Sequence, residues 1–234
     1  MSWVLANLPT IAGHLLAHLL QAVPAIIASF VLAIPVARLA RAARPLRAVL
    51  VTGSSLLYAV PSLALFVILP IVLANGIRDP LNVIVALTLY GLALLVPATA
   101  DALDAVDARV LDAATAMGMG RLRCFLTVEL PLAGPAILTG LRVVTVSTIS
   151  LTTVGAVLGV RSLGWLFTDG FQRGVTAEIL TGLVSTAALA LILDGLVLAL
   201  GRLCLPWTWK RVGTSGAAVA GVGAATSASQ EGKA

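Results

Sequence analysis

The side chains that most often perform chemistry are scarce in this sequence. His14 and His18 lie four residues apart, as two metal ligands on one helix face would, but no carboxylate or third ligand lies nearby in the sequence. The two cysteines, Cys124 and Cys204, do not complete the pattern of a structural zinc site. We therefore interpret the histidines as a polar pair at a membrane interface, and the sequence predicts no metal site and no cofactor.

Catalytic motifs are also missing from the sequence. It contains no nucleophile elbow, no HExxH string and no glycine-rich loop of the G-x-x-x-x-G-K-[ST] type. The chain is therefore not expected to be an enzyme, and it cannot bind and hydrolyse ATP with a loop of its own.

The composition of the chain accounts for this scarcity of polar and charged side chains. Of the 234 residues, 59% are hydrophobic and 11% are charged, whereas soluble domains carry about 25% charged residues. This excludes a soluble enzyme, a disulfide-stapled domain and a nucleic-acid-binding module, so no nucleic acid partner is expected. The sequence predicts an all-α polytopic membrane protein whose solvent is the lipid bilayer.

Five stretches are long and apolar enough to cross a bilayer core of roughly 30 Å, which needs about 20 helical residues. They are residues 15–37, 49–74, 81–100, 135–159 and 179–201. We expect residues 1–14 to form an extracytoplasmic segment, and residues 15–204 to form a transmembrane domain that carries a cytoplasmic loop at 101–130. Residues 213–234 are rich in Gly, Ala, Ser and Thr without periodicity, so we expect residues 205–234 to form a disordered cytoplasmic tail.

Basic residues predict the orientation, because Lys and Arg accumulate on the cytoplasmic side. Three alternate connecting segments hold eleven of them: Arg38, Arg41, Arg44, Arg47, Arg109, Arg121, Arg123, Arg202, Lys210, Arg211 and Lys233. The other two loops hold Arg78, Arg161 and Arg173. The N-terminus is therefore expected outside and the C-terminus in the cytoplasm, which also places both cysteines near the reducing side.

Two charged residues fall within the expected spans. Asp194 lies about two-thirds of the way along the fifth span and Arg142 near the cytoplasmic end of the fourth. A charge at the bilayer centre costs roughly 2.5–3.5 kcal/mol on insertion scales. We expect the two side chains to form a stabilising pair and not a solute or proton site.

The loop 101–130 contains the most specific pattern in the chain, DALDAVDARVLDAATAMGMGRLRCFLTVELP. Apolar residues at helical spacing predict an amphipathic helix that starts near Asp104, and Gly118 and Gly120 end it. A second short helix is expected from Leu122, and Pro131 is expected to open the fourth span. The small residues at the bend would let the backbone of another protein come close.

This loop resembles that of permease subunits of binding-protein-dependent ABC importers. Those permeases share the residues EAA, then three residues, G, nine residues and I-x-L-P in one cytoplasmic loop. The matching positions here, with Asp for Glu and Val for Ile, are Asp112, Ala113, Ala114, Gly118, Val128, Leu130 and Pro131. The resemblance identifies them as an ATPase-coupling loop.

Further segments are similar to the glycine betaine/carnitine/choline subfamily of these permeases. AVPSLALFVILP at 59–70 looks like the IPSLALF segment of that subfamily, and the similarity covers roughly residues 15–204. In the fourth span, hydroxyl side chains share one face at i, i+3 and i+7, as either a path lining or a close helix contact would require. The candidates for a translocation path are Tyr58, Pro61, Ser62, Thr145, Thr148 and Thr152.

The resemblance implies the type I ABC importer permease fold in a bacterial plasma (inner) membrane. It also implies two ATPase subunits, a second permease subunit (a copy or a paralogue) and an extracytoplasmic solute-binding protein. The solute would be glycine betaine, choline, carnitine or proline. With 5% aromatic residues, the sequence shows no obvious aromatic cage for a quaternary ammonium group.

Two other interpretations stay open at this stage. An amino-acid importer permease would share the loop motif. A self-contained secondary transporter or channel would need coupling acids near the midplane and often has internal repeats, whereas this sequence has one such acid and no clear repeat.

Overall fold

The computed structural model describes residues 2–41 and 44–209, and this part of the chain contains helices and no strands. Four helices are long: α2 (Leu8–Ala40), α6 (Pro80–Asp104), α9 (Leu130–Thr152) and α11 (Thr176–Cys204). The short α-helices are α1 (Ser2–Ala6), α3 (Arg44–Arg47), α4 (Gly53–Tyr58), α5 (Ser62–Leu73), α7 (Ala108–Ala116), α8 (Arg121–Cys124), α10 (Trp165–Arg173) and α12 (Pro206–Trp209). Two π-helical turns, η1 (Ala48–Thr52) and η2 (Phe125–Glu129), and a 3₁₀ turn, η3 (Thr153–Leu158), link them.

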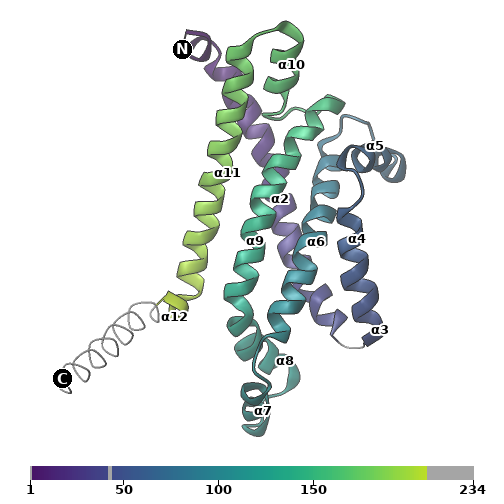
Figure 1. Ribbon diagram of the computed structural model, residues 1–234, viewed down its shortest axis with the longest axis vertical. Helices are drawn as coiled ribbons and strands as arrows, with labels where there is room; N and C mark the ends of the chain where they lie inside the picture. The colour runs from purple at the N-terminus through teal and green to yellow at the C-terminus, as the bar shows by residue number, and fades with distance from the viewer. Residues whose placement is uncertain (1, 42–43, 210–234) are drawn as a thin grey trace, which may run out of the picture.

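The long helices form a bundle with α6 near its centre. α6 packs against α2, α9 and α4, and α11 packs against the far side of α9 (Figure 1). In the most apolar stretch of each helix, 56% of the residues are buried in α6 and 6% in α11, so α11 presents most of its surface to the surroundings. α1 and α10 lie at one end of the bundle, and α7 and α8 project from the other (Figure 1).

Four of the five expected spans are confirmed as long apolar helices: 15–37 lies in α2, 81–100 in α6, 179–201 in α11, and most of 135–159 in a helix that contains α9. Each is long and apolar enough to cross a membrane. The chain is therefore an all-α, multi-pass membrane protein.

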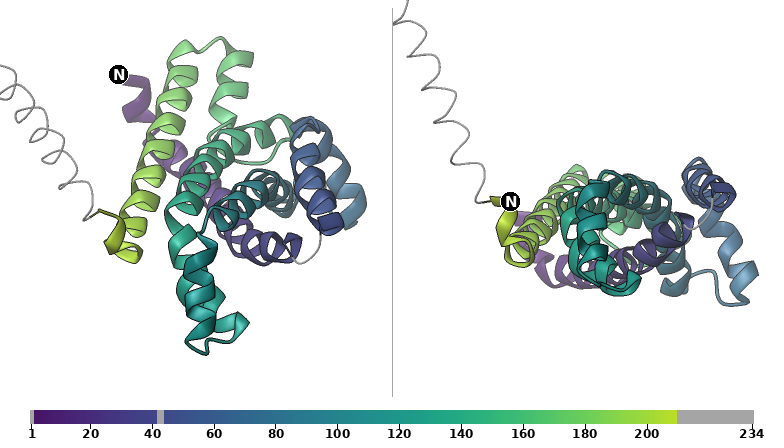
Figure 2. Two further views of the ribbon diagram at one scale, coloured as in Figure 1. Left: turned by 60° about the horizontal axis from the view of Figure 1, so that its bottom comes forward. Right: turned by 90° about the horizontal axis from the view of Figure 1, so that it is seen from below.

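The expected span over 49–74 is present as a bent pair of helices and not as one continuous helix. The helical stretches Pro45–Tyr58 and Ser62–Leu73 meet at an angle of 109°. Pro61 lies at the break with an extended backbone, φ −59° and ψ 127°. It has no N–H to donate to the preceding turn, and its ring disfavours a helical residue before it. Viewed along the bundle, α5 lies at its periphery (Figure 2).

The loop helices also differ from expectation. α6 continues to Asp104, so the amphipathic helix does not start there but at Ala108, where Asp107 caps it. Asp107 Oδ1 accepts a hydrogen bond of 2.9 Å from the backbone N–H of Arg109. Hydrogen bonds from the Arg109 backbone and side chain lower the pKa of the Asp107 carboxyl, so this cap stays charged well below neutral pH.

The second loop helix is not separate from the fourth span, because helical structure is continuous from Arg121 to Leu158. Pro131 lies just after the π-helical turn η2, in which the Leu130 N–H donates to the Phe125 carbonyl. A proline ring clashes with the carbonyl four residues earlier, and the wider π turn relieves that clash. A proline that was expected to start a helix is therefore accommodated inside one.

Part of the expected tail, residues 210–234, lies outside the described residues, and so do its basic residues Lys210, Arg211 and Lys233. Within the expected tail 205–234, residues 206–209 form the short helix α12.

Small side chains hold α2 against its neighbours. A buried stripe along α2 consists of Ala22, Ala25, Ser29, Ala33, Ala37 and Ala40. Ser29 Oγ donates to the Ala25 carbonyl at 2.7 Å and also lies 3.2 Å from the Thr88 carbonyl of α6. Small residues of this kind allow two membrane helices to approach closely. Gly91 of α6 lies directly opposite Ser29 of α2.

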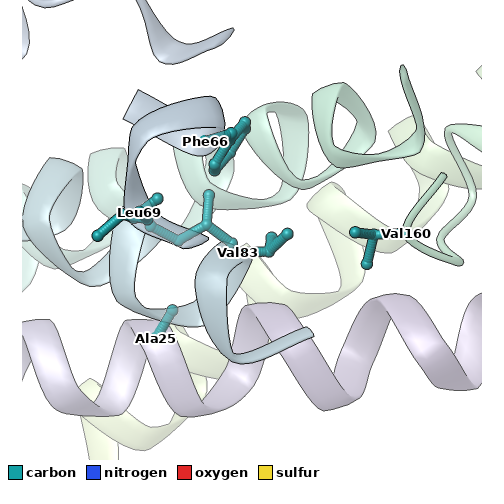
Figure 3. Packing of buried hydrophobic residues seen from close by; sticks show 7 residues of the cluster. Ala25, Phe66, Leu69, Val83 and Val160 are labelled. Carbon is teal, nitrogen blue, oxygen red and sulfur yellow. The ribbon is translucent and has the colours of Figure 1, made fainter. Parts of the chain in front are cut away.

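A separate apolar cluster fixes the displaced helix α5. Figure 3 shows Phe66 and Leu69 of α5 packed with Val83 of α6, Ala25 of α2 and Val160. All five are buried. The cluster anchors α5 by its inner face, while the rest of α5 stays exposed in the single subunit.

We predict that Gly91→Ala destabilises the bundle, because a Cβ at this position would lie 2.0 Å from Ser29 Oγ and 2.6 Å from Ser29 Cβ. Overpacking of this kind costs about 1–3 kcal/mol, and the loss should appear as a lower melting temperature in detergent. Gly195→Ala is the matched control, because a Cβ there meets no atom within 4 Å.

The double variant Gly91→Ala/Ser29→Gly should recover most of the lost stability, since it removes the atoms in conflict. Equal melting temperatures for Gly91→Ala and Gly195→Ala would contradict the close α2–α6 contact.

Candidate functional site

The motif residues of the loop lie on the projecting end formed by α7 and α8 (Figure 1). Asp112 and Ala113 of α7 are exposed, and so is Gly118 in the turn that follows. Large apolar side chains are exposed around them: Val110, Met117, Leu122 and Leu126. An exposed apolar surface with a polar border is typical of a protein-binding site.

Gly118 determines the shape of this projection. Its φ of +82° is in the left-handed region that favours glycine. The Met119 N–H donates to the Ala114 carbonyl at 3.2 Å, and the Gly118 N–H donates to the Thr115 carbonyl at 2.9 Å. These two bonds form a Schellman motif that ends α7 and turns the chain toward α8. A Cβ at Gly118 would meet no atom within 4 Å, so the need for glycine is conformational and not steric.

The other motif residues face the rest of the chain. Ala114 is 2% exposed and is the one buried residue of α7. α7 packs against α8 and η2, so the small size of Ala114 serves this packing. Val128, Leu130 and Pro131 are half-buried where the helix enters the bundle. The motif therefore combines an exposed tip with a packed base.

Ion pairs join the base of this projection to the bundle. Arg41, just after α2, pairs with Glu129 of η2 and, through its Nε at 2.8 Å, with Asp104 Oδ1 at the end of α6. Arg47 also pairs with Asp104. Arg38 of α2 lies over the Phe125 ring, 4.2 Å from its centre. The end of α2 is thus tied directly to η2, and Asp104 ties the end of α6 to Arg41 and Arg47.

Sequence reasoning treated these arginines as orientation signals and missed their partners. The available signal was the set of acids that begins and ends the loop, namely Asp101, Asp104 and Glu129. No helical spacing relates Arg41 to Glu129, 88 residues away, so their pairing follows only from the fold.

The hydroxyl stripe of α9 lies inside the subunit. Thr145, Thr148 and Thr152 are all buried. The Thr145 hydroxyl donates to the Leu141 carbonyl at 2.9 Å, and the Thr152 hydroxyl donates to the Thr148 carbonyl at 2.7 Å. Two of the three hydroxyls are therefore used within their own helix.

The other path candidates lie together at the break between α4 and α5. Tyr58 and Pro61 are exposed and Ser62 is half-buried. Tyr90 of α6 lies behind them, with its ring centre 5.9 Å from that of Tyr58 and the two planes at 84°. The Tyr90 hydroxyl donates to the Val60 carbonyl at 2.5 Å. The structure thus brings the two tyrosines of the chain together, which the sequence did not suggest.

Arg142 and Asp194 lie side by side between α9 and α11. Arg142 Nε donates to Asp194 Oδ1 at 2.8 Å, and Arg142 Nη2 donates to Oδ2 at 2.6 Å. This two-point geometry is the strong form of an arginine–carboxylate pair. The Asp194 side chain is 19% exposed and the Arg142 side chain 39%, so the pair lies at the edge of the helix contact.

The two histidines are buried at the end of the bundle that carries α10. His14 stacks on Trp165, with ring centres 6.2 Å apart, and His18 is fully buried. In residues 2–41 and 44–209, no group of three or more His, Cys, Asp or Glu side chains is arranged to hold a metal ion. The two histidines therefore give no indication of a metal site in this part of the chain.

The chain is similar to permease subunits of known transport systems. Residues 26–205 match the family described as "Binding-protein-dependent transport system inner membrane component". The chain is 30% identical over 197 residues to the choline transport system permease protein OpuBD of Bacillus subtilis, covering 84% of this chain and 86% of OpuBD. It is 30% identical over 178 residues to the glycine betaine/carnitine/choline transport system permease protein OpuCD of the same organism, covering 76% of each chain.

A solved structure shows the same fold. A chain of the methionine ABC transporter MetNI, in inward-facing conformations, superposes with a TM-score of 0.71. The superposition covers 83% of this chain and 95% of that chain at 18% sequence identity. At this identity the likeness concerns the fold alone.

We predict that Arg142 and Asp194 stabilise the α9–α11 contact as a pair. Asp194→Asn and Arg142→Gln should each lower the melting temperature in detergent, because each strands one charge within the bundle. The double variant should unfold closer to the parental temperature than either single variant. Additive losses, or an unchanged melting temperature with altered solute affinity in Asp194→Asn, would contradict this role.

Proposed function

Because this chain belongs to the family of inner membrane components of binding-protein-dependent transport systems, we propose that it forms the path of an ABC importer for compatible solutes. The solute class that we propose is quaternary ammonium compounds such as glycine betaine, choline and carnitine, with proline as a further candidate. The similarity to OpuBD, over most of both chains, is the observation that carries the solute class.

An amino-acid importer is less well supported. The resemblance to solved amino-acid transporters is structural, at 17–19% identity, and it concerns the fold alone. The relatives that are 27–30% identical over most of their length are named for choline, glycine betaine and carnitine. A secondary transporter is disfavoured too, because Asp194 is engaged by Arg142 and not available as a free coupling acid.

In the proposed mechanism, ATP hydrolysis takes place on two partner ATPase subunits, one docked on each permease subunit. The exposed tip around Met117 and Gly118 would enter the ATPase surface. Closure of the ATPases would displace α7 and α8, and the ion pairs of Arg41 and Arg47 would carry that displacement to α2 and α6. Rocking of the two permease bundles would then open the path to alternate sides.

This mechanism requires a defined orientation. The tip with α7 and α8 must be cytoplasmic, which agrees with the charge bias of the sequence. The end that carries α1 and α10 would then face an extracytoplasmic binding protein that delivers the solute. A second permease subunit, identical or paralogous, would complete the path.

Transport in a defined system tests the solute class. The full chain, co-purified with its ATPase and placed in proteoliposomes with its binding protein, should take up radiolabelled glycine betaine, choline or carnitine only when ATP is supplied. Excess histidine or methionine should not compete. Uptake driven by an ion gradient without ATP, or uptake of histidine or methionine alone, would contradict the proposal.

Gly118→Asp should weaken docking of the ATPase. The substitution places a charge at the exposed tip and forces a non-glycine residue to φ +82°, which costs roughly 1–2 kcal/mol. We expect reduced co-purification of the ATPase and reduced uptake, with a melting temperature no lower than that of a variant that carries the same backbone strain elsewhere.

Gly174→Asp is the control, because Gly174 is exposed outside the loop, has a φ of +68°, and a Cβ there also meets no atom within 4 Å. Normal ATPase binding and normal uptake by Gly118→Asp would overturn the assignment of the coupling tip. Loss of the protein from the membrane would instead show that the turn is needed for folding alone.

A further inference from the structure

The exposed backbone at the break between α4 and α5 needs an explanation in a membrane protein. Residues 58–61 are all exposed in the single subunit. The Tyr90 hydroxyl reaches the Val60 carbonyl, and Tyr90 is near the middle of α6, which is itself a candidate membrane span. The break therefore lies within the membrane and not at its surface.

Non-helical backbone does not face lipid at this depth, because lipid cannot hydrogen-bond to peptide groups. It is tolerated where protein covers it or where it lines a water-filled cavity. Pro61 also keeps this segment from closing into a helix. The exposed side of the break must therefore face either another subunit or the solute path.

The chemistry of the break suits a cation. Residues 53–73 contain no charged side chain, so an ion in this region would meet dipoles and aromatic faces. Tyr58 is 47% exposed. The Tyr90 ring is perpendicular to the Tyr58 ring and does not stack face to face with it, so much of Tyr58 is accessible to a solute.

Tyr90 fixes the position of this open ring. It is 3% exposed, and its hydroxyl is held by the Val60 carbonyl, two residues after Tyr58. An aromatic ring that is positioned in advance binds a cation with a smaller loss of conformational entropy. Quaternary ammonium groups, which cannot donate hydrogen bonds, are recognised through such rings.

From this geometry we infer that Tyr58, positioned by Tyr90, is a solute-contacting residue that binds the trimethylammonium group in transit. The inference rests on the proposed function, because it assumes a quaternary ammonium solute. Choline, glycine betaine and carnitine differ in their other groups but share trimethylammonium. A site that contacts this group alone would pass all three and would hold each weakly, as a translocation path requires.

The test uses the complete complex in proteoliposomes, with glycine betaine as the probe. Tyr58→Phe keeps the ring and should transport at a rate close to that of the wild type. Tyr58→Leu removes the ring and should lower the uptake rate about two- to thirtyfold, the range of one cation–π contact. Leu56→Ala is the control, an exposed position on the same helix.

Phenylalanines with increasing numbers of ring fluorines at position 58 provide the sharper measurement. Fluorine withdraws charge from the ring face with little change in shape, so uptake should fall stepwise along the series. Because these variants keep the shape of the ring, they stay informative even if Tyr58→Leu fails to fold.

Three results would overturn the inference while wild-type uptake of glycine betaine leaves the proposed function intact. They are an uptake rate of Tyr58→Leu equal to that of Leu56→Ala, no slope along the fluorinated series, and separation of the two permease subunits in Tyr58→Leu. The last would show that the break faces a subunit interface. Failure of the wild-type complex to import any quaternary ammonium compound would instead overturn the proposed function.

Discussion

The requirement that every backbone N–H and C=O group find a partner without water governs this structure. Long helices meet it over most of the chain, and Ser and Thr hydroxyls within them donate to carbonyls four residues earlier, as Ser29 and Thr152 do. Pro24, Pro35 and Pro97 lie inside long helices. Pro61 interrupts a span completely, and there the Tyr90 side chain supplies a donor to the exposed backbone.

The same constraint divides the contacts between helices into two kinds. In the middle of the bundle, close approach comes from small side chains, as at Gly91 and Ser29, because apolar residues gain little by leaving lipid for another helix. At the end that carries α7, charged side chains connect the helices, with Arg41 and Arg47 joined to Asp104. Arg41 also pairs with Glu129 of η2 at the base of the projection, so a force applied to the projection would act on the ends of α2 and α6 first.

Hydrophobic run length and the loop motif predicted four spans and the projecting loop from the sequence alone. They did not give the size of the bend in the remaining span. Residues 49–74 are apolar enough for one span, and the structure shows that the helix turns by 109° at the break that contains Pro61. Pro131 had the opposite outcome, because the preceding π turn let the helix continue through it. A proline sets a local restriction, and the surrounding packing determines whether the helix bends, breaks or continues.

Which residues far apart in the sequence contact one another could be predicted for one pair only. Arg142 and Asp194 could be matched because charges are rare and costly inside spans, which leaves few partners to choose from. Tyr58 and Tyr90 carry no such signal, since an aromatic residue in a membrane helix needs no partner. Their contact depends on the packing of α4 along α6, which places the last residue of α4 beside the middle of α6. A low aromatic content argued against a cage in the sequence, but the fold places the two tyrosines together at the interrupted span. Composition therefore limits how many rings a site can contain, whereas the packing of distant helices determines whether those rings meet.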